Sequence, residues 1–312
     1  MRRVLTALTF MMLALAGQVL AEKEKEPPAG ADLQLQTRTG KGVANGSSAL
    51  DRAFHAMYDL NFQVADNELA NYTTEHPNDP LGPAAQAAST LFSIFDQHKV
   101  LQSEFFASDD RYTQRPAILP DPAAVQRFES ALDRAEELSK HALSQNSTDE
   151  NALFTMALVY GLRADYAALV ERHDLAALRF ADKGSEWARK LLAISPDFCD
   201  AYVATGIEKY LVGVRPAPVR WMLRVGGIKG DQKAGLRELE LAARRGRYLA
   251  PFARILLAIA DLRRSKYKEA IELLGDLRQQ FPHNPLFADE VARLKQNQTT
   301  SPHHTPAASG GL

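Results

Sequence analysis

The sequence predicts an all-α protein built from antiparallel helix pairs that stack side by side. Its long stretches of Ala, Leu, Glu, Lys and Arg favour helices, and they lack the alternating β-branched runs that strands require. Small residues also recur at a fixed interval before a proline. A stack of two-helix repeats needs small residues where helices touch and a proline where the second helix stops, so this recurrence indicates such a stack.

The N-terminal residues 1–21 are typical of a signal peptide. Two arginines precede an apolar run from Val4 to Leu15, and Ala21 is a suitable residue before a cleavage site. The run is shorter than the roughly 20 residues that a membrane span needs. Glu22 stands where a lipid-anchored protein would need a cysteine. We therefore expect an exported protein, periplasmic or secreted, without stable membrane insertion.

Shifts in composition mark the ends of the folded body. Residues 22–48 carry an alternating Glu-Lys run and a Pro-Pro pair, and residues 296–312 are polar with two prolines and a Gly-Gly pair. Such segments bury too little apolar surface to offset the entropy of ordering, so we expect both to be disordered. The repeat domain is then expected over residues 49–295. Its single cysteine, Cys199, excludes an intramolecular disulfide and is expected to pack as a small apolar side chain.

Two segments carry the repeat spacing most clearly. Each has a small residue, larger residues at +4 and +7, and a proline at +12: Ala65, Leu69, Tyr72 and Pro77 in the first, and Ala270, Leu274, Leu277 and Pro282 in the second. Ala258 supplies a small residue on the helix before the second segment. The pattern closely resembles the tetratricopeptide repeat, a family of helix pairs about 34 residues long. This resemblance implies an α-solenoid of stacked pairs.

Other segments carry weaker forms of the pattern. Ala135 and Ala142 keep the spacing but lack the proline, and Ser147 is expected to be the N-cap of the next helix. Pro196 closes another second helix, after which Gly206 takes the small position of the following first helix. Residues 196–274 are also similar to the eukaryotic tetratricopeptide repeat protein 39 family. That similarity implies a helical-repeat fold and transfers no mechanism.

Two insertions interrupt the repeats, at residues 93–122 and 211–230. Loops of this length in a compact domain are usually functional or disordered. The second insertion contains a short basic and amphipathic stretch, which supplies the candidate partner-binding residues Arg215, Arg220, Trp221 and Arg224. This stretch has two alternative interpretations, attachment to a membrane surface and a phosphate cradle made by its glycines. A helix cap explains the glycine-rich end better, with Asp231 as the N-cap of a helix through Ala243.

Charge and motifs narrow the class of function. With 37 basic and 38 acidic side chains and a net charge of -1, the protein is not expected to bind nucleic acid. The sequence holds no Gly-x-Ser-x-Gly, His-Glu-x-x-His or Cys-x-x-Cys motif. We therefore expect no enzymatic activity, no cofactor and no metal site.

Stacked helix pairs offer a concave groove, lined by the first helix of each pair, that suits an extended peptide or a helix. The leading hypothesis is an interaction module or scaffold for a protein or peptide partner. The alternative is a ligand-binding accessory subunit of a transport or envelope system, in which the insertions close the groove into a pocket. The sequence leaves the identity of the partner and the oligomeric state open.

Overall fold

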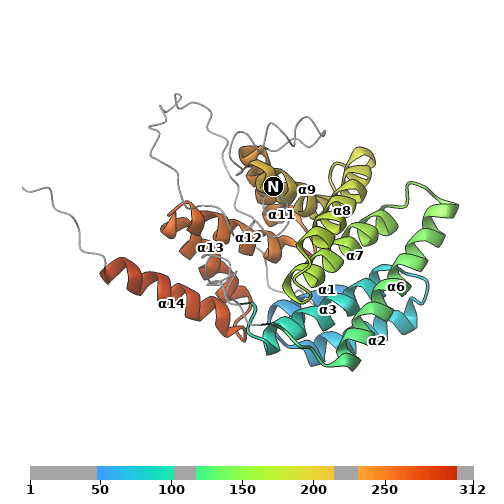
Figure 1. Cartoon of the computed structure of the whole chain (residues 1–312), viewed down its shortest axis with the longest axis horizontal. Coiled ribbons are helices and arrows are strands. Elements are labelled where there is room, and N and C mark those ends of the chain that lie inside the picture. The colour runs from blue at the N-terminus through green and yellow to red at the C-terminus, as the bar shows by residue number, and fades with distance from the viewer. Residues whose placement is uncertain (1–47, 102–116, 214–230, 301–312) are drawn as a thin grey trace, which may run out of the picture.

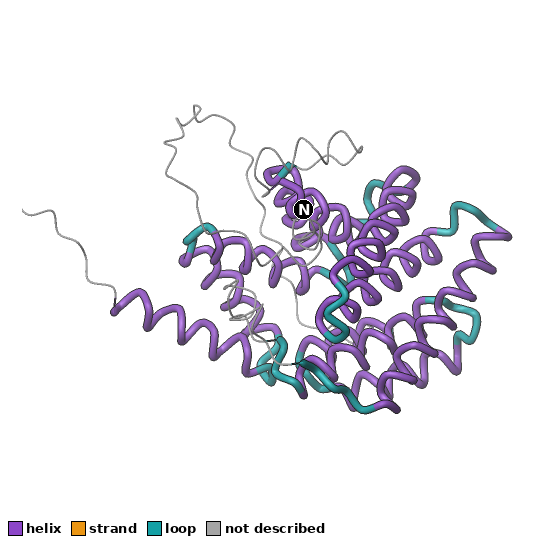
Figure 2. The backbone as a smooth tube through the Cα atoms, viewed as in Figure 1, coloured by secondary structure: helices purple, strands orange, loops and turns teal. Residues whose placement is uncertain are grey.

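The computed structural model describes residues 48–101, 117–213 and 231–300, and Figure 1 draws the rest of the chain in grey. All regular structure within these ranges is helical, and Figure 2 shows only helices and the loops between them there. The helices are α1 (Ala49–Tyr58), α2 (Phe62–Glu75), α3 (Leu81–Gln97), α6 (Pro122–Gln145), α7 (Glu150–Leu169), α8 (Asp174–Ile194), the short 3-10 helix η1 (Cys199–Ala201), α9 (Tyr202–Gly213), α11 (Gln232–Arg245), α12 (Ala250–Arg263), α13 (Tyr267–Gln280) and α14 (Pro285–Thr300). The all-α prediction is confirmed.

The helices pack in the order in which they occur along the chain. The pairs are α1 with α2, α3 with α6, α7 with α8, α9 with α11, and α12 with α13, and α14 packs against α13. The second helix of each pair also contacts the first helix of the next pair. The successive pairs follow an arc from α1 around to α14 (Figure 1). Among the helices described, none combines the length and the apolar character that a bilayer span requires.

Proline ends three of these helices as the spacing predicts. α2, α8 and α13 each end two residues before one of the prolines Pro77, Pro196 and Pro282. In each case the backbone N–H of the intervening C-cap residue still donates to the carbonyl four residues earlier, at 2.8 Å. Proline has no N–H and disfavours helical geometry in the residue before it, so the helix stops there.

The helix starts agree with the sequence in one case and differ in another. Asp231 is the N-cap of α11, and its carboxylate accepts the backbone N–H of Ala234 at 3.0 Å. The N-cap of α7 is Asp149, which accepts from Ala152 at 2.8 Å, and the prediction of Ser147 is wrong. Asp149 takes this position because its side chain is the acceptor adjacent to the first helical residue.

Small residues lie where the helices meet. Ala65, Ala135 and Ala270 are fully buried, Ala258 and Gly206 are buried, and Ala142 is half-buried. The closest approach is between α9 and α11, where a Cβ on Gly235 would lie 2.6 Å from the carbonyl oxygen of Gly206. Only glycine permits these two backbones to come so close.

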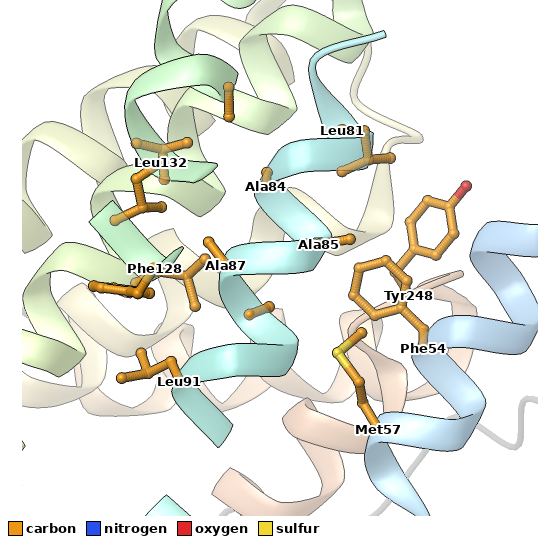
Figure 3. Close-up of a cluster of buried hydrophobic side chains, with 14 of the residues drawn as sticks. Phe54, Met57, Leu81, Ala84, Ala85, Ala87, Leu91, Phe128, Leu132 and Tyr248 are labelled. Atoms are coloured by element: carbon orange, nitrogen blue, oxygen red, sulfur yellow. The ribbon is translucent and has the colours of Figure 1, made fainter. Parts of the chain in front are cut away.

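One part of the core joins three helices of the first two pairs. Figure 3 shows Phe54 and Met57 of α1 on one side of α3, and Phe128 and Leu132 of α6 on its other side. The face of α3 between them is mostly alanine, which allows both neighbours to pack closely against it. Tyr248, from the loop before α12, lies against Phe54 with ring centroids 4.7 Å apart.

The contact of Tyr248 belongs to a set that joins α1 to loops about 190 to 226 residues away along the chain. The hydroxyl of Tyr58 donates to the carbonyl oxygen of Tyr248 at 3.0 Å, and the amide of Asn284 donates to the carbonyl oxygen of Tyr58 at 2.8 Å. The rings of Tyr58 and Phe281 lie 5.5 Å apart. Arg247 pairs with Asp51 at 2.8 Å. The first helix therefore closes the arc against the loops that precede α12 and α14.

The predicted segment boundaries can be placed only in part. α3 runs to Gln97 and α6 begins at Pro122, so the described residues of the first insertion are helical up to Gln97. Ser48, at the end of the segment expected to be disordered, is the N-cap of α1 and forms a capping box with Asp51. α14 continues to Thr300, inside residues 296–312, because no proline or glycine interrupts it before Pro302. Residues 1–47 lie outside the described ranges.

Candidate functional site

A cavity of about 780 Å³, called the interior cavity below, lies inside the arc of helices. It is lined by α1, α3, α7, α9 and α12, the first helices of the five pairs, together with α8 and α14 and one residue of α13. Within the described ranges, α2, α6 and α11 contribute no lining residue. The first helix of every pair thus faces the inside of the arc, and α8 is a second helix that reaches the cavity as well. Cavities that hold small ligands are of this size.

The wall of the interior cavity is predominantly apolar. Its aromatic and large aliphatic residues include Phe54, Met57, Phe92, Phe95, Phe154, Leu158, Leu162, Leu178, Ile207, Phe252, Ile255, Leu256, Ile259, Leu262 and Phe287. These side chains come from α1, α3, α7, α8, α9, α12 and α14. Burial of apolar ligand surface against such a wall contributes a favourable free energy of about 25 cal/mol per Å².

Gly161, near the middle of α7, helps to keep this space open. Apart from the backbone of its own helix and its chain neighbours, no described residue lies within 4 Å of the position where its Cβ would be. Glycine inside a helix lowers stability by roughly 0.5–1 kcal/mol relative to alanine, and no close approach requires it here. Its effect on the structure is to widen the interior cavity at this point of α7.

Asp165 lies one helical turn after Gly161 on the same face of α7, and it also lines the interior cavity. The residue is half-buried because its side chain faces the cavity. Within the described part of the chain, the carboxylate has no hydrogen bond and no ion pair. Burial alone raises its pKa to about 7.

Asp200, in η1 directly before α9, shows how a buried carboxylate of the same wall is stabilised. Its two oxygens accept the backbone N–H groups of Arg247, Tyr248 and Leu249 at 2.9, 3.0 and 2.7 Å. Burial raises the pKa of Asp200, and these three hydrogen bonds oppose that rise. The carboxylate thus holds the loop that leads into α12, and it is not available to a ligand.

The remaining charged groups of the wall are paired or lie at its exposed edge. Glu208 of α9 pairs with Arg189 at 2.5 Å, and Glu290 of α14 pairs with Arg293. Arg179, Asp182 and Asp289 are exposed. Asp165 therefore differs from the other acidic residues of the cavity in being both withdrawn from bulk solvent and unpaired among the residues that the structure describes.

The residues predicted as a partner-binding site cannot be located. Arg215, Arg220, Trp221 and Arg224 all lie in residues 214–230, outside the described ranges. The small residues and prolines of the repeat pattern lie at helix contacts and helix ends, and among them only Ala258 also lines the interior cavity; Leu274, from the same pattern, lines it too. Among the residues described, no group of three or more His, Cys, Asp or Glu side chains is placed to hold a metal ion.

Sequence reasoning missed Gly161 and Asp165. A usable signal was present, because glycine interrupts a run of good helix formers and an acidic residue follows four positions later on the same face. No family model matches the sequence, and no curated protein matches it significantly. The function is therefore inferred from the geometry of the interior cavity.

Proposed function

We propose that the protein is a tetratricopeptide-like α-solenoid that binds an apolar small molecule in its interior cavity. The helical-repeat part of this proposal is supported by the packing of helix pairs in chain order and by the alanines and prolines at their contacts and ends. The ligand-binding part is supported above all by one observation, a cavity of about 780 Å³ with a predominantly apolar wall. Gly161 adds to it, since that residue leaves the space unfilled.

The alternative function from the sequence, a ligand-handling accessory protein, thus becomes the preferred one. The contacts of α1 with Tyr248 and Phe281 join the first helix to the last part of the arc, so the cavity, although partly open to solvent, suits a compact ligand better than a long peptide laid along an open groove. A role as a scaffold for a protein or peptide partner stays a prediction. The signal peptide, the exported location and the absence of enzymatic activity also stay predictions.

The test compares two glycine substitutions in the full chain. Gly161→Leu places a side chain in the interior cavity, whereas Gly275→Leu places the same side chain on α13 at a position that also has open space around it and does not line the cavity. Both changes replace a glycine inside a helix by a good helix former, so both proteins should fold.

Binding is measured with Nile red, a neutral apolar dye whose fluorescence rises in apolar surroundings. We expect the wild type and Gly275→Leu to bind the dye with similar affinity and Gly161→Leu to bind it at least about tenfold more weakly, because the leucine occupies part of the ligand space. Native mass spectrometry of the purified wild type provides a second readout of any bound molecule. Equal dye binding by all three proteins, or no binding by the wild type, would refute the proposed function.

A further inference from the structure

The chemical class of the ligand can be inferred from Asp165, the charged lining residue that is not exposed and has no partner among the described residues. Asp165 lies in a wall of apolar side chains, and its neighbours in that wall on α7 and α8 include Gly161, Leu162, Leu169 and Ala177. A carboxylate withdrawn from water without a partner is costly, and such groups in proteins are normally paired or hydrogen-bonded. Because no residue of the described ranges pairs with Asp165, the interior cavity favours a ligand that supplies a partner.

The other charged groups that line the cavity in the described part of the chain do not supply it; Asp200 of η1, for example, is engaged by three backbone N–H groups. From α8 the wall contains Arg179 and Asp182, both exposed at the edge, and from α9 it contains Glu208, which pairs with Arg189. From α14 it contains Asp289, which is exposed, and Glu290, which pairs with Arg293. The lining residues of α1, α3 and α12 include no Asp, Glu, Lys, Arg or His. Among the described lining residues, the charged group that is neither exposed nor paired is therefore Asp165, and its charge is negative.

We propose that the ligand is an apolar molecule carrying a positively charged nitrogen, and that the carboxylate of Asp165 binds this nitrogen. This inference rests on the proposed function and deepens it. A hydrogen bond from a charged N–H to an ionised carboxylate is about twice as strong as one between neutral groups, and a nitrogen without N–H is still attracted by its charge, so a cation satisfies Asp165 better than a neutral alcohol does. The aromatic rings of the wall also favour a cationic nitrogen through their π faces. A lone carboxylate is a poor metal site, since metal ions are held by several ligands.

Three probes with the same octyl chain separate the chemistry of the head group from the burial of the chain. They are octyltrimethylammonium, 1-octanol and octanoate, each measured by displacement of Nile red at pH 8. The quaternary ammonium keeps its charge at every pH, so any pH dependence comes from the protein. We expect octyltrimethylammonium to bind at least about tenfold more tightly than 1-octanol, and octanoate to bind most weakly.

The matched variants are Asp165→Asn and Glu186→Gln. Asp165→Asn keeps the shape of the side chain and removes its charge, and we expect it to weaken octyltrimethylammonium about tenfold or more while leaving 1-octanol and Nile red within about twofold. Glu186→Gln removes a carboxylate from an exposed position of α8 that does not line the interior cavity, and it should change none of the affinities. A tenfold difference corresponds to about 1.4 kcal/mol.

A pH series on the wild type alone gives a readout that does not depend on any variant. Because burial raises the pKa of Asp165 to about 7, the carboxylate is about nine-tenths ionised at pH 8 and about one-tenth ionised at pH 6. The affinity for octyltrimethylammonium should therefore fall about tenfold between pH 8 and pH 6, and the affinity for 1-octanol should not change. In Asp165→Asn the ammonium probe should lose this pH dependence.

The outcomes separate this inference from the function on which it rests. If Nile red and all three octyl probes bind equally well and without pH dependence, the proposal of a cationic ligand is refuted, and the proposed binding of an apolar molecule is still supported. If neither the dye nor any octyl probe binds, both proposals fall. If Asp165→Asn lowers the stability of the ligand-free protein at pH 8, the carboxylate already has a partner within the chain, and the inference is overturned.

Discussion

Replacement of Asp165 by asparagine should stabilise the ligand-free protein at alkaline pH. The pKa of this carboxyl rises from 3.8 to about 7 on folding, a change of about 3.2, and one pKa unit corresponds to about 1.4 kcal/mol. The ionised form is thus less stable in the folded protein by about 4 kcal/mol. Because the folded-state pKa is raised, this cost is absent below about pH 3.8, grows as the pH rises towards 7, and is fully present above it.

Asparagine resembles the protonated acid in shape and carries no charge, so the variant should escape the cost at every pH. Urea denaturation of both proteins should show Asp165→Asn more stable by up to about 4 kcal/mol at pH 8 and by only about 1 kcal/mol at pH 4.5. Carboxylates whose pKa is lowered by an arginine, such as Asp51 beside Arg247, make the folded protein more stable as the pH rises. Both proteins contain them, so their effect cancels when the two are compared at the same pH. A variant that is less stable than the wild type at pH 8, or a difference that does not change with pH, would refute the description of Asp165 as a half-buried carboxylate that no described residue pairs with.

Three further predictions concern the helix contacts and the closure of the arc, each measured by urea denaturation. Gly161→Ala should raise the free energy of unfolding by about 0.5–1 kcal/mol, because alanine is the better helix former and space is available. Gly235→Ala should lower it by about 1–3 kcal/mol, because the added Cβ would clash with the backbone of α9. Similar effects at both positions would contradict the packing described. Asp200→Ala should lower the free energy of unfolding by about 3 kcal/mol and speed hydrogen exchange of the amides at residues 247–249, because these amides lose their acceptor. Unchanged exchange at these amides would count against the hydrogen bonds. Phe281→Ala should lower the free energy of unfolding by about 3–5 kcal/mol and reduce the hydrogen-exchange protection of α1. A loss of protection confined to α13 and α14 would argue against a contact between α1 and this part of the arc.

The local structure was largely predictable from the sequence, because it depends on neighbours along the chain. Pro77, Pro196 and Pro282 stop their helices through the missing N–H of proline, which acts on the preceding turn whatever the rest of the protein does. Asp231 caps α11 for an equally local reason. The prediction of Ser147 as a cap was wrong because several acceptors stand close together before α7, and the sequence does not say which one is adjacent to the first helical residue.

Small residues at the helix contacts, such as Ala65 and Ala270, could likewise be recognised by their spacing. A fixed spacing shows that two helices pack closely, since larger side chains would hold them apart. It does not show how far each pair is rotated relative to the one before. Those rotations add up along the chain, and their sum sets where the last helices lie relative to the first.

The sequence by itself therefore determined the helical class, the ends of several helices and the contacts between neighbours, all of which follow from interactions within a few turns. Only the tertiary structure decided that Tyr58 meets Tyr248 and Asn284, that the first helices enclose an interior cavity, and that Asp165 faces this space. An aspartate on a helix looks the same in a sequence whether it points to water or into an apolar cavity. The difference arises from segments that are distant along the chain and are brought together by the accumulated turn of the helix pairs.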